Sequence, residues 1–171
     1  DEESFWRAQP NVRKVVGFIA RNVASVPLHL YERVGDTDRR RVTDHPLARL
    51  LSSPRPGVGA FRFWNDVLSD GLLYDRWGVV KGRRSDGGLE LIAVPSKHMR
   101  LDVDQWRRVN SMRVWAADPE SGRHQWVRFP LDQVIFDHGY APTTAGLTPI
   151  ETLRDVLDES AEAVRYRRQV W

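Results

Sequence analysis

The 171-residue sequence predicts an α+β fold with helices near the N-terminus, a central antiparallel strand region and a long C-terminal helix. Changes in hydrophobic period support this prediction. Apart from a strand-like stretch at residues 28–34, apolar residues recur every three to four positions up to about residue 75. They alternate with a period of two between Trp77 and Phe136 and return to the helical period after Thr148. The helices and strands are grouped rather than strictly alternating, which disfavours a βαβ fold.

The first predicted helix follows Asn11, which is suited to cap it, and Pro27 ends it. Pro27 has no amide hydrogen for a helical bond and biases Val26 toward an extended backbone. Residues 28–34 then alternate like a strand. The apolar positions of this helix are Val12, Val15, Val16, Ile19, Ala20 and Val23.

Two more helices are predicted after residues 35–41, a glycine-led charged stretch that is typical of a loop or a hairpin tip. Asp44 or His45 can cap a short helix with Pro46 in its first turn. Residues 60–75 form the next helix. Its expected buried stripe is Phe61, Trp64, Val67, Leu68 and Leu72.

Short antiparallel strands are predicted from Trp77 onward. Residues 77–94 read as two strands joined at Asp86-Gly87-Gly88, and a turn and a short strand follow from Pro95. Residues 111–129 read as a second hairpin that closes over 118–122. The last predicted strand runs from Val134 to Phe136.

The final helix is predicted by a capping box, Thr148-Pro149-Ile150-Glu151. Acidic residues fill its early turns and arginines its last turn, which suits the helix dipole. The chain stops at Trp171 without a C-cap, so we expect either a cut through a longer protein or a limit of ordered chain. We divide it into an N-terminal arm, residues 1–10, and one α+β domain, residues 11–171.

Composition and motifs argue against an enzyme. The chain has no cysteine, which excludes disulfides and thiol catalysis, and no apolar run of about 18 residues that could span a membrane. No phosphate-binding glycine loop, G-x-S-x-G motif or metal-ligand spacing is present. We therefore expect no catalytic residue, metal or cofactor. A hydrolase built on Asp137 and His138 is a distant alternative, because adjacent side chains on a strand diverge.

The net charge of +3 permits contact with a polyanion without requiring it. Two arginine clusters are candidate phosphate contacts, although each is more simply a solvated surface. A nucleic-acid-binding module that uses them is our alternative function. The cluster residues are Arg39, Arg40, Arg41, Arg165, Arg167 and Arg168.

The sequence contains seven tryptophans, a large number for one domain to bury, and aromatic residues are enriched in protein–protein contacts. We therefore expect some of them to meet another subunit. The candidates are Trp6, Trp106 and Trp171.

Six short motifs, in order and at compatible spacing, resemble the phage portal proteins of long-tailed siphoviruses. Each motif is weak alone, but together they extend over nearly the whole chain. They are Val23–Leu28 (VASVPL), Asp44–Leu47 (DHPL), Pro54–Pro56 (PRP), Trp77–Gly78 (WG), Val94–Ser96 (VPS) and Gly146–Ile150 (GLTPI).

This resemblance implies a structural subunit of a homo-oligomeric ring, a dodecamer, at one vertex of the virion capsid. Double-stranded DNA passes through such a ring without sequence specificity during packaging and ejection. The implied partners are the terminase large subunit, the capsid or scaffold protein and head-completion proteins, with assembly in the host cytoplasm and no membrane involvement. The resemblance also implies that the chain is the N-terminal, wing-like part of a portal, without the remaining stem, clip and channel elements.

Overall fold

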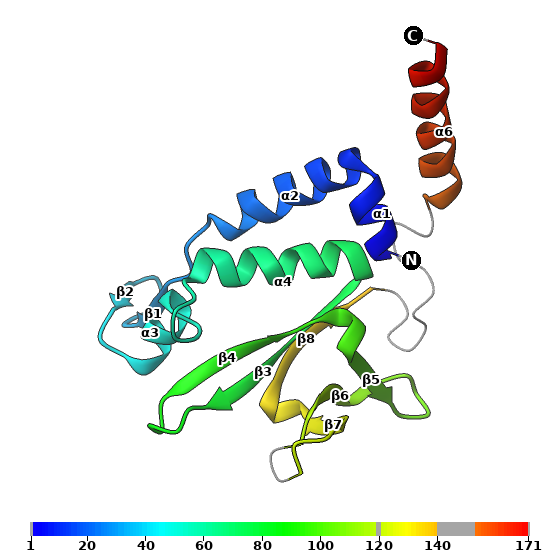
Figure 1. Cartoon of the computed structure of the whole chain (residues 1–171). Coiled ribbons are helices and arrows are strands. Elements are labelled where there is room, and N and C mark those ends of the chain that lie inside the picture. The colour runs from blue at the N-terminus through cyan, green and yellow to red at the C-terminus, as the bar shows by residue number, and fades with distance from the viewer. Residues whose placement is uncertain (1, 119–120, 140–152, 171) are drawn as a thin grey trace.

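The computed structural model describes residues 2–118, 121–139 and 153–170. Figure 1 shows a stack of layers, in which helix α2 (Pro10–Ala24) lies over helix α4 (Ala60–Tyr74) and α4 lies over a β-sheet. A second sheet lies on the far side of the first. The predicted α+β class is confirmed.

Both sheets in this stack have three antiparallel strands. The first has the order β4-β3-β8 and the second the order β5-β6-β7. Two short 3-10 turns, η1 (Ser96–His98) and η2 (Leu131–Gln133), join β4 to β5 and β7 to β8. The strands are β3 (Arg76–Arg83), β4 (Leu89–Val94), β5 (Met99–Val103), β6 (Val109–Ala117), β7 (His124–Pro130) and β8 (Val134–His138).

The remaining elements lie around this stack. Strands β1 (Leu30–Arg33) and β2 (Arg39–Val42) form a separate two-stranded hairpin beside helix α3 (Pro46–Ser52). Helix α1 (Glu2–Ala8) precedes α2, and helix α6 (Arg154–Val170) projects from the body near α1.

Several boundaries differ from the sequence-based predictions. Residues 2–8 of the expected arm form α1, and α2 begins at Pro10 with Gln9, not Asn11, as its N-cap. Residues 25–29 separate α2 from β1, so Pro27 lies within a connection rather than at a direct junction. The predicted capping box, 148–151, lies outside the described residues.

The start of α3 settles one alternative that the sequence left open. His45, not Asp44, is the N-cap, and its Nδ1 accepts a hydrogen bond from the Leu47 amide at 3.1 Å. Asp44 instead pairs with Arg49, at 2.7 Å.

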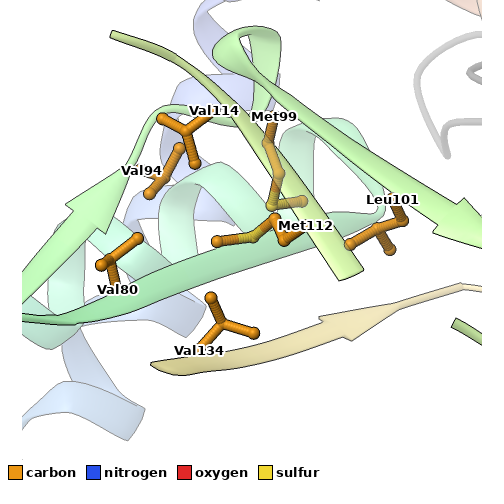
Figure 2. Packing of buried hydrophobic residues seen from close by; sticks show 7 residues of the cluster. All are labelled: Val80, Val94, Met99, Leu101, Met112, Val114 and Val134. Atoms are coloured by element: carbon orange, nitrogen blue, oxygen red, sulfur yellow. The ribbon is translucent and has the colours of Figure 1, made fainter. Parts of the chain in front are cut away.

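The main core lies between the two sheets (Figure 2). Alternate residues of each strand point into it because successive side chains of a strand leave opposite faces of the sheet. Gly78 of β3 is buried there, where a Cβ would overlap the sulfur atoms of Met99 and Met112. The core residues are Val80, Val94, Met99, Leu101, Met112, Val114 and Val134.

A second cluster lies between α4 and the opposite face of the first sheet. Phe63 and Val67 of α4 pack there on Val79 and Leu91. The predicted stripe of α4 is correct at Val67 but wrong at Phe61, which is 50% exposed. Helix α4 packs on α2 as well as on the sheet, so apolar residues occur around more than one of its sides.

A polar contact fastens α4 to the turn after β4. The carboxylate of Asp70 accepts a hydrogen bond from the Ser96 amide at 2.5 Å, and the Ser96 hydroxyl donates to the Arg76 carbonyl at 2.6 Å. Burial raises the pKa of the Asp70 carboxyl, and this effect exceeds the opposing effects of the Ser96 hydrogen bonds and of the charges on Lys97 and Arg76.

Candidate assembly and nucleic-acid surfaces

The sequence predicted a loop or a hairpin tip for residues 35–41, and the structure shows a hairpin whose second strand, β2, contains the first arginine cluster. Consecutive strand residues point to opposite faces, so Arg39, Arg40 and Arg41 do not form one patch. Arg40 pairs with Glu32 at 2.7 Å, and Arg41 contacts the Nδ1 of His29 at 2.9 Å. Of the three side chains, only that of Arg39 has no polar partner among the described residues.

The second arginine cluster lies at the end of α6, where Arg165, Arg167 and Arg168 are exposed. Figure 1 places α6 and the β1–β2 hairpin at opposite ends of the molecule. One copy of the chain therefore does not combine the two arginine clusters into a single surface.

The three tryptophans predicted as subunit contacts differ in environment. Trp6 of α1 is partly buried against a cluster centred on Val16 and Leu73. Trp106 lies in the turn between β5 and β6 and is 71% exposed. Trp171 lies outside the described residues.

Asp137 and His138 end strand β8 and line a cavity of about 240 Å³ together with Asp75 and Arg76. The ring Nδ1 of His138 lies 2.6 Å from the carbonyl oxygen of Gly139, with which it can share a hydrogen bond. The residues that line this cavity include no serine, threonine, cysteine or lysine to act as a nucleophile. The side chains in its lining that could act as a nucleophile or a base are therefore the carboxylates of Asp75 and Asp137 and the imidazole of His138.

Over residues 2–118, 121–139 and 153–170, no group of three or more histidine, aspartate or glutamate side chains is placed to hold a metal ion. None of the described helices is both long enough and apolar enough to cross a membrane.

The outer face of the second sheet carries a feature that the sequence analysis missed. Strand register places Arg100 of β5, Arg113 of β6 and Arg128 of β7 side by side across all three strands. We call these three residues the arginine row. Trp115 and Trp126 form the adjacent cross-strand pair, with ring centroids 5.4 Å apart. The sequence contains one such arginine in each of the three strands, but only the strand register shows that the three lie side by side.

The arginine row is held by several side-chain contacts. Arg113 binds the Asp102 carboxylate, with its Nη2 2.6 Å from Oδ1 and its Nε donating to both carboxylate oxygens. Arg128 donates from Nε to the Ser111 hydroxyl at 2.9 Å, and the Arg100 guanidinium lies 4.3 Å from the ring centroid of Trp126. These contacts fix the orientation of all three guanidinium groups.

The Asp102 carboxylate forms an ion pair with one of the three arginines, Arg113. Partial burial raises the pKa of Asp102, but hydrogen bonds from Arg113 and Ser111 and the charges of Arg113 and Arg128 outweigh that effect, so the pKa lies below its ordinary value. Asp102 is thus ionised at neutral pH and compensates one of the three positive charges.

A second exposed feature is the outer ridge of α2, which we define as Val15, Phe18, Ile19 and Val23. These large apolar side chains lie on one side of the helix and are all exposed. The inner side of α2, with Val16, Ala20 and Ala24, is buried. Grouped apolar exposure of this kind is more typical of interaction surfaces than of free surface.

Comparisons with known proteins concern the fold of the chain and not these surfaces. The family model for phage portal proteins matches residues 10–171. A comparison with curated proteins finds no match.

Three solved structures share the fold over 99% of this chain. One is the neck of an empty gene transfer agent particle computed with C6 symmetry, with a TM-score of 0.74 and 20% identity. Another is the virion of a native gene transfer agent particle, with a TM-score of 0.68 and 17% identity, and the third is the neck of a native particle computed with C12 symmetry, with a TM-score of 0.67 and 18% identity. This chain covers 46%, 44% and 44% of those chains, so it spans less than half of their length.

The family match extends over almost the entire chain and includes every described strand of both sheets. The resemblance seen in the sequence motifs is confirmed, and the chain belongs to the phage portal protein family.

Proposed function

We propose that this chain is part of a structural portal subunit, which forms a homo-oligomeric ring at one vertex of a viral capsid or a related particle. DNA passes through this ring during packaging and ejection, and the tail attaches to it. The observation that carries the proposal is the portal family match over residues 10–171, supported by a shared fold with neck structures over 99% of the chain. The family predicts a ring of twelve copies.

Residues 11–171 act in this proposal as one rigid α+β body, and the stem, clip and channel-lining elements lie outside residues 1–171. The share of 46% that this chain covers in a solved neck chain supports this division. The proposed partners are the terminase large subunit, the capsid or scaffold protein and head-completion proteins. The proposed location is the virion, after assembly in the host cytoplasm.

Ring closure requires two different complementary faces on each subunit, because a rotational ring is built from heterologous contacts. The exposed outer ridge of α2 and the exposed Trp106 supply contact surface of the expected kind. The core lies between the layers of the chain, so these exposed side chains are not part of it.

The proposal is tested by expressing the full-length protein and determining its oligomeric state. Sedimentation velocity and negative-stain electron microscopy are expected to show discrete rings with a central hole. A protein that stays monomeric at high concentration contradicts the proposal. Residues 1–171 alone serve as a control for the fold, measured by circular dichroism.

DNA contact by the two arginine clusters remains a separate prediction. Replacing Arg165, Arg167 and Arg168 with alanine is expected to lower DNA affinity and to flatten its dependence on salt, since each lost phosphate contact reduces the number of counterions released. Fluorescence anisotropy at several salt concentrations measures both quantities. Unchanged affinity and salt dependence contradict a role in DNA contact.

A further inference from the structure

The arginine row is an unusual arrangement of charges in a β-sheet. Directly opposed like charges on neighbouring strands are destabilising, and here three arginines stand in consecutive register across β5, β6 and β7. Asp102 compensates only one of the charges. Such repulsion between like charges destabilises the isolated chain. Destabilising features of this kind are expected at functional sites.

The chemistry of the row favours a carboxylate ligand. One arginine of the row, Arg113, already binds a carboxylate, that of Asp102. Arg100 and Arg128 are exposed, and no described residue supplies an acceptor for the Arg100 guanidinium. Arginine's planar fork of N–H donors binds a carboxylate through two parallel hydrogen bonds.

Single-stranded nucleic acid fits this surface less well. A base needs an open ring face on which to stack. The ring of Trp126 is covered by Arg100, and the planes of Trp115 and Trp126 are inclined to each other by 58°. Trp115 is 39% exposed and could stack on one base, so the surface offers fixed donors and not a succession of stacking faces.

A matching acidic surface occurs on α6. Four of its carboxylates recur at helical i, i+3, i+4 and i+7 spacing, so they lie on one side of the helix. All four are exposed and none forms an ion pair with another described residue. We call them the acidic stripe, and its members are Asp155, Asp158, Glu159 and Glu162.

One copy of the chain does not bring these two surfaces together. Figure 1 shows α6 rising from the body near α1, whereas β5, β6 and β7 lie at the other end of the stack, beyond α4 and the first sheet. A second copy can supply the missing partner. Two different faces that complement each other are what a head-to-tail ring contact requires.

We propose that the arginine row of one subunit binds the acidic stripe on α6 of the neighbouring subunit. Arg100 and Arg128 receive carboxylates of the stripe, while Asp102 keeps Arg113 in place and Trp126 supports Arg100. This contact rests on the proposed ring function and identifies one of the interfaces that close the ring.

The test is a charge-exchange experiment in the full-length protein. One variant carries Arg100→Glu with Arg128→Glu, a second carries Glu159→Lys with Glu162→Lys, and a third combines all four changes. Sedimentation velocity measures the protein concentration at which half of the chains are in rings. Each double variant is expected to raise that concentration by about tenfold or more, and the combined variant is expected to restore most of the loss.

A matched control is Arg55→Glu with Arg83→Glu, which changes the net charge equally at exposed arginines outside the second sheet. This control is expected to leave ring assembly unchanged. Circular dichroism confirms that each variant is folded. If the arginine reversal disrupts folding, Arg100→Gln with Arg128→Gln replaces it, and ring assembly is then expected to become less sensitive to salt.

The outcomes separate the two proposals. Absence of rings in the unaltered full-length protein overturns the ring function and the contact together. Rings that are insensitive to both reversals, assembly that is lost in both without rescue in the combined variant, or arginine variants that lose DNA affinity rather than assembly overturn the contact alone. In the glutamine variant, an unchanged salt dependence of assembly also overturns the contact.

Discussion

The layer between the two sheets and the outer ridge of α2 consist of similar apolar side chains in opposite environments. Met112, between the sheets, is 0% exposed, whereas Phe18 on α2 is 66% exposed. The first region is closed by contacts within the chain, since both sheets contribute side chains to it (Figure 2). The second has no covering element among the described residues.

The difference separates apolar residues that stabilise the fold, which lie between the sheets, from apolar residues that are available for contacts with other molecules, which lie on α2. Burial between the sheets stabilises the chain by itself, because the side chains leave water on folding. The outer ridge of α2 leaves water only when something else covers it. Mutations in the two regions should therefore separate stability from assembly.

The largest effect is expected for Met112→Ala. This change removes most of a fully buried side chain at the centre of the sheet–sheet layer and is expected to lower the free energy of unfolding by about 2–5 kcal/mol. Urea unfolding of residues 1–171, followed by circular dichroism, measures it. A loss as small as that of a surface substitution would show that the two sheets do not pack as described.

The next effect is expected for Gly78→Ala. The added methyl group would overlap the sulfur atoms of Met99 and Met112, and overpacking of this kind costs about 1–3 kcal/mol of unfolding free energy. Gly35→Ala is the matched control, because no heavy atom lies within 4 Å of its added Cβ. The same urea titration compares both variants, and equal losses would contradict a close approach of the sheets at Gly78.

A pH-dependent effect is expected for Asp70→Asn, at the contact between α4 and η1. Burial raises the pKa of the Asp70 carboxyl in the folded chain above its ordinary value, so the folded state holds this proton over a pH range in which the unfolded state has lost it. Stability of the unaltered chain therefore falls as pH rises through that range. Asparagine keeps an acceptor oxygen for the Ser96 amide but carries no charge.

The stability of Asp70→Asn relative to the unaltered chain should accordingly rise between about pH 3 and about pH 7. Urea unfolding at both pH values tests this, and Asp66→Asn, which alters an exposed carboxylate on the same helix, provides the comparison. A relative stability that stays constant or falls with pH would contradict the burial of the Asp70 charge.

The smallest effect on stability is expected for Phe18→Ala on the outer ridge of α2. An exposed side chain adds little to the fold, so the free energy of unfolding should change by no more than about 0.5 kcal/mol. Comparison with Met112→Ala sharpens the contrast between the two regions. A loss as large as that of Met112→Ala would mean that α2 is covered within the chain.

The sequence predicted the order and type of most elements because their signals are local. Hydrophobic period located α2, α4 and the two hairpins β3–β4 and β6–β7, and the charged turns marked where they ended. The start of α2 was predicted too late, although Pro10 at its first position is a local signal for a helix start. Gln9, its N-cap, donates from its side chain to the carbonyl of Leu157 in α6, a contact that no local pattern reveals.

The surfaces were harder to predict than the elements. Whether Phe61 or Phe63 is buried depends on how α4 sits between α2 and the sheet, which helical period alone does not determine. The arginine row exists only through the registers of β5 with β6 and of β6 with β7. Conversely, Arg39 to Arg41 are neighbours in sequence but not on one face, because β2 is a strand.

Electron cryo-microscopy of the full-length assembly tests the central claim most directly. The account predicts a closed ring in which every subunit keeps the two-sheet layer seen here and contacts its neighbours through two different faces. Particles that are monomeric, or paired through the same face on both copies, would contradict it.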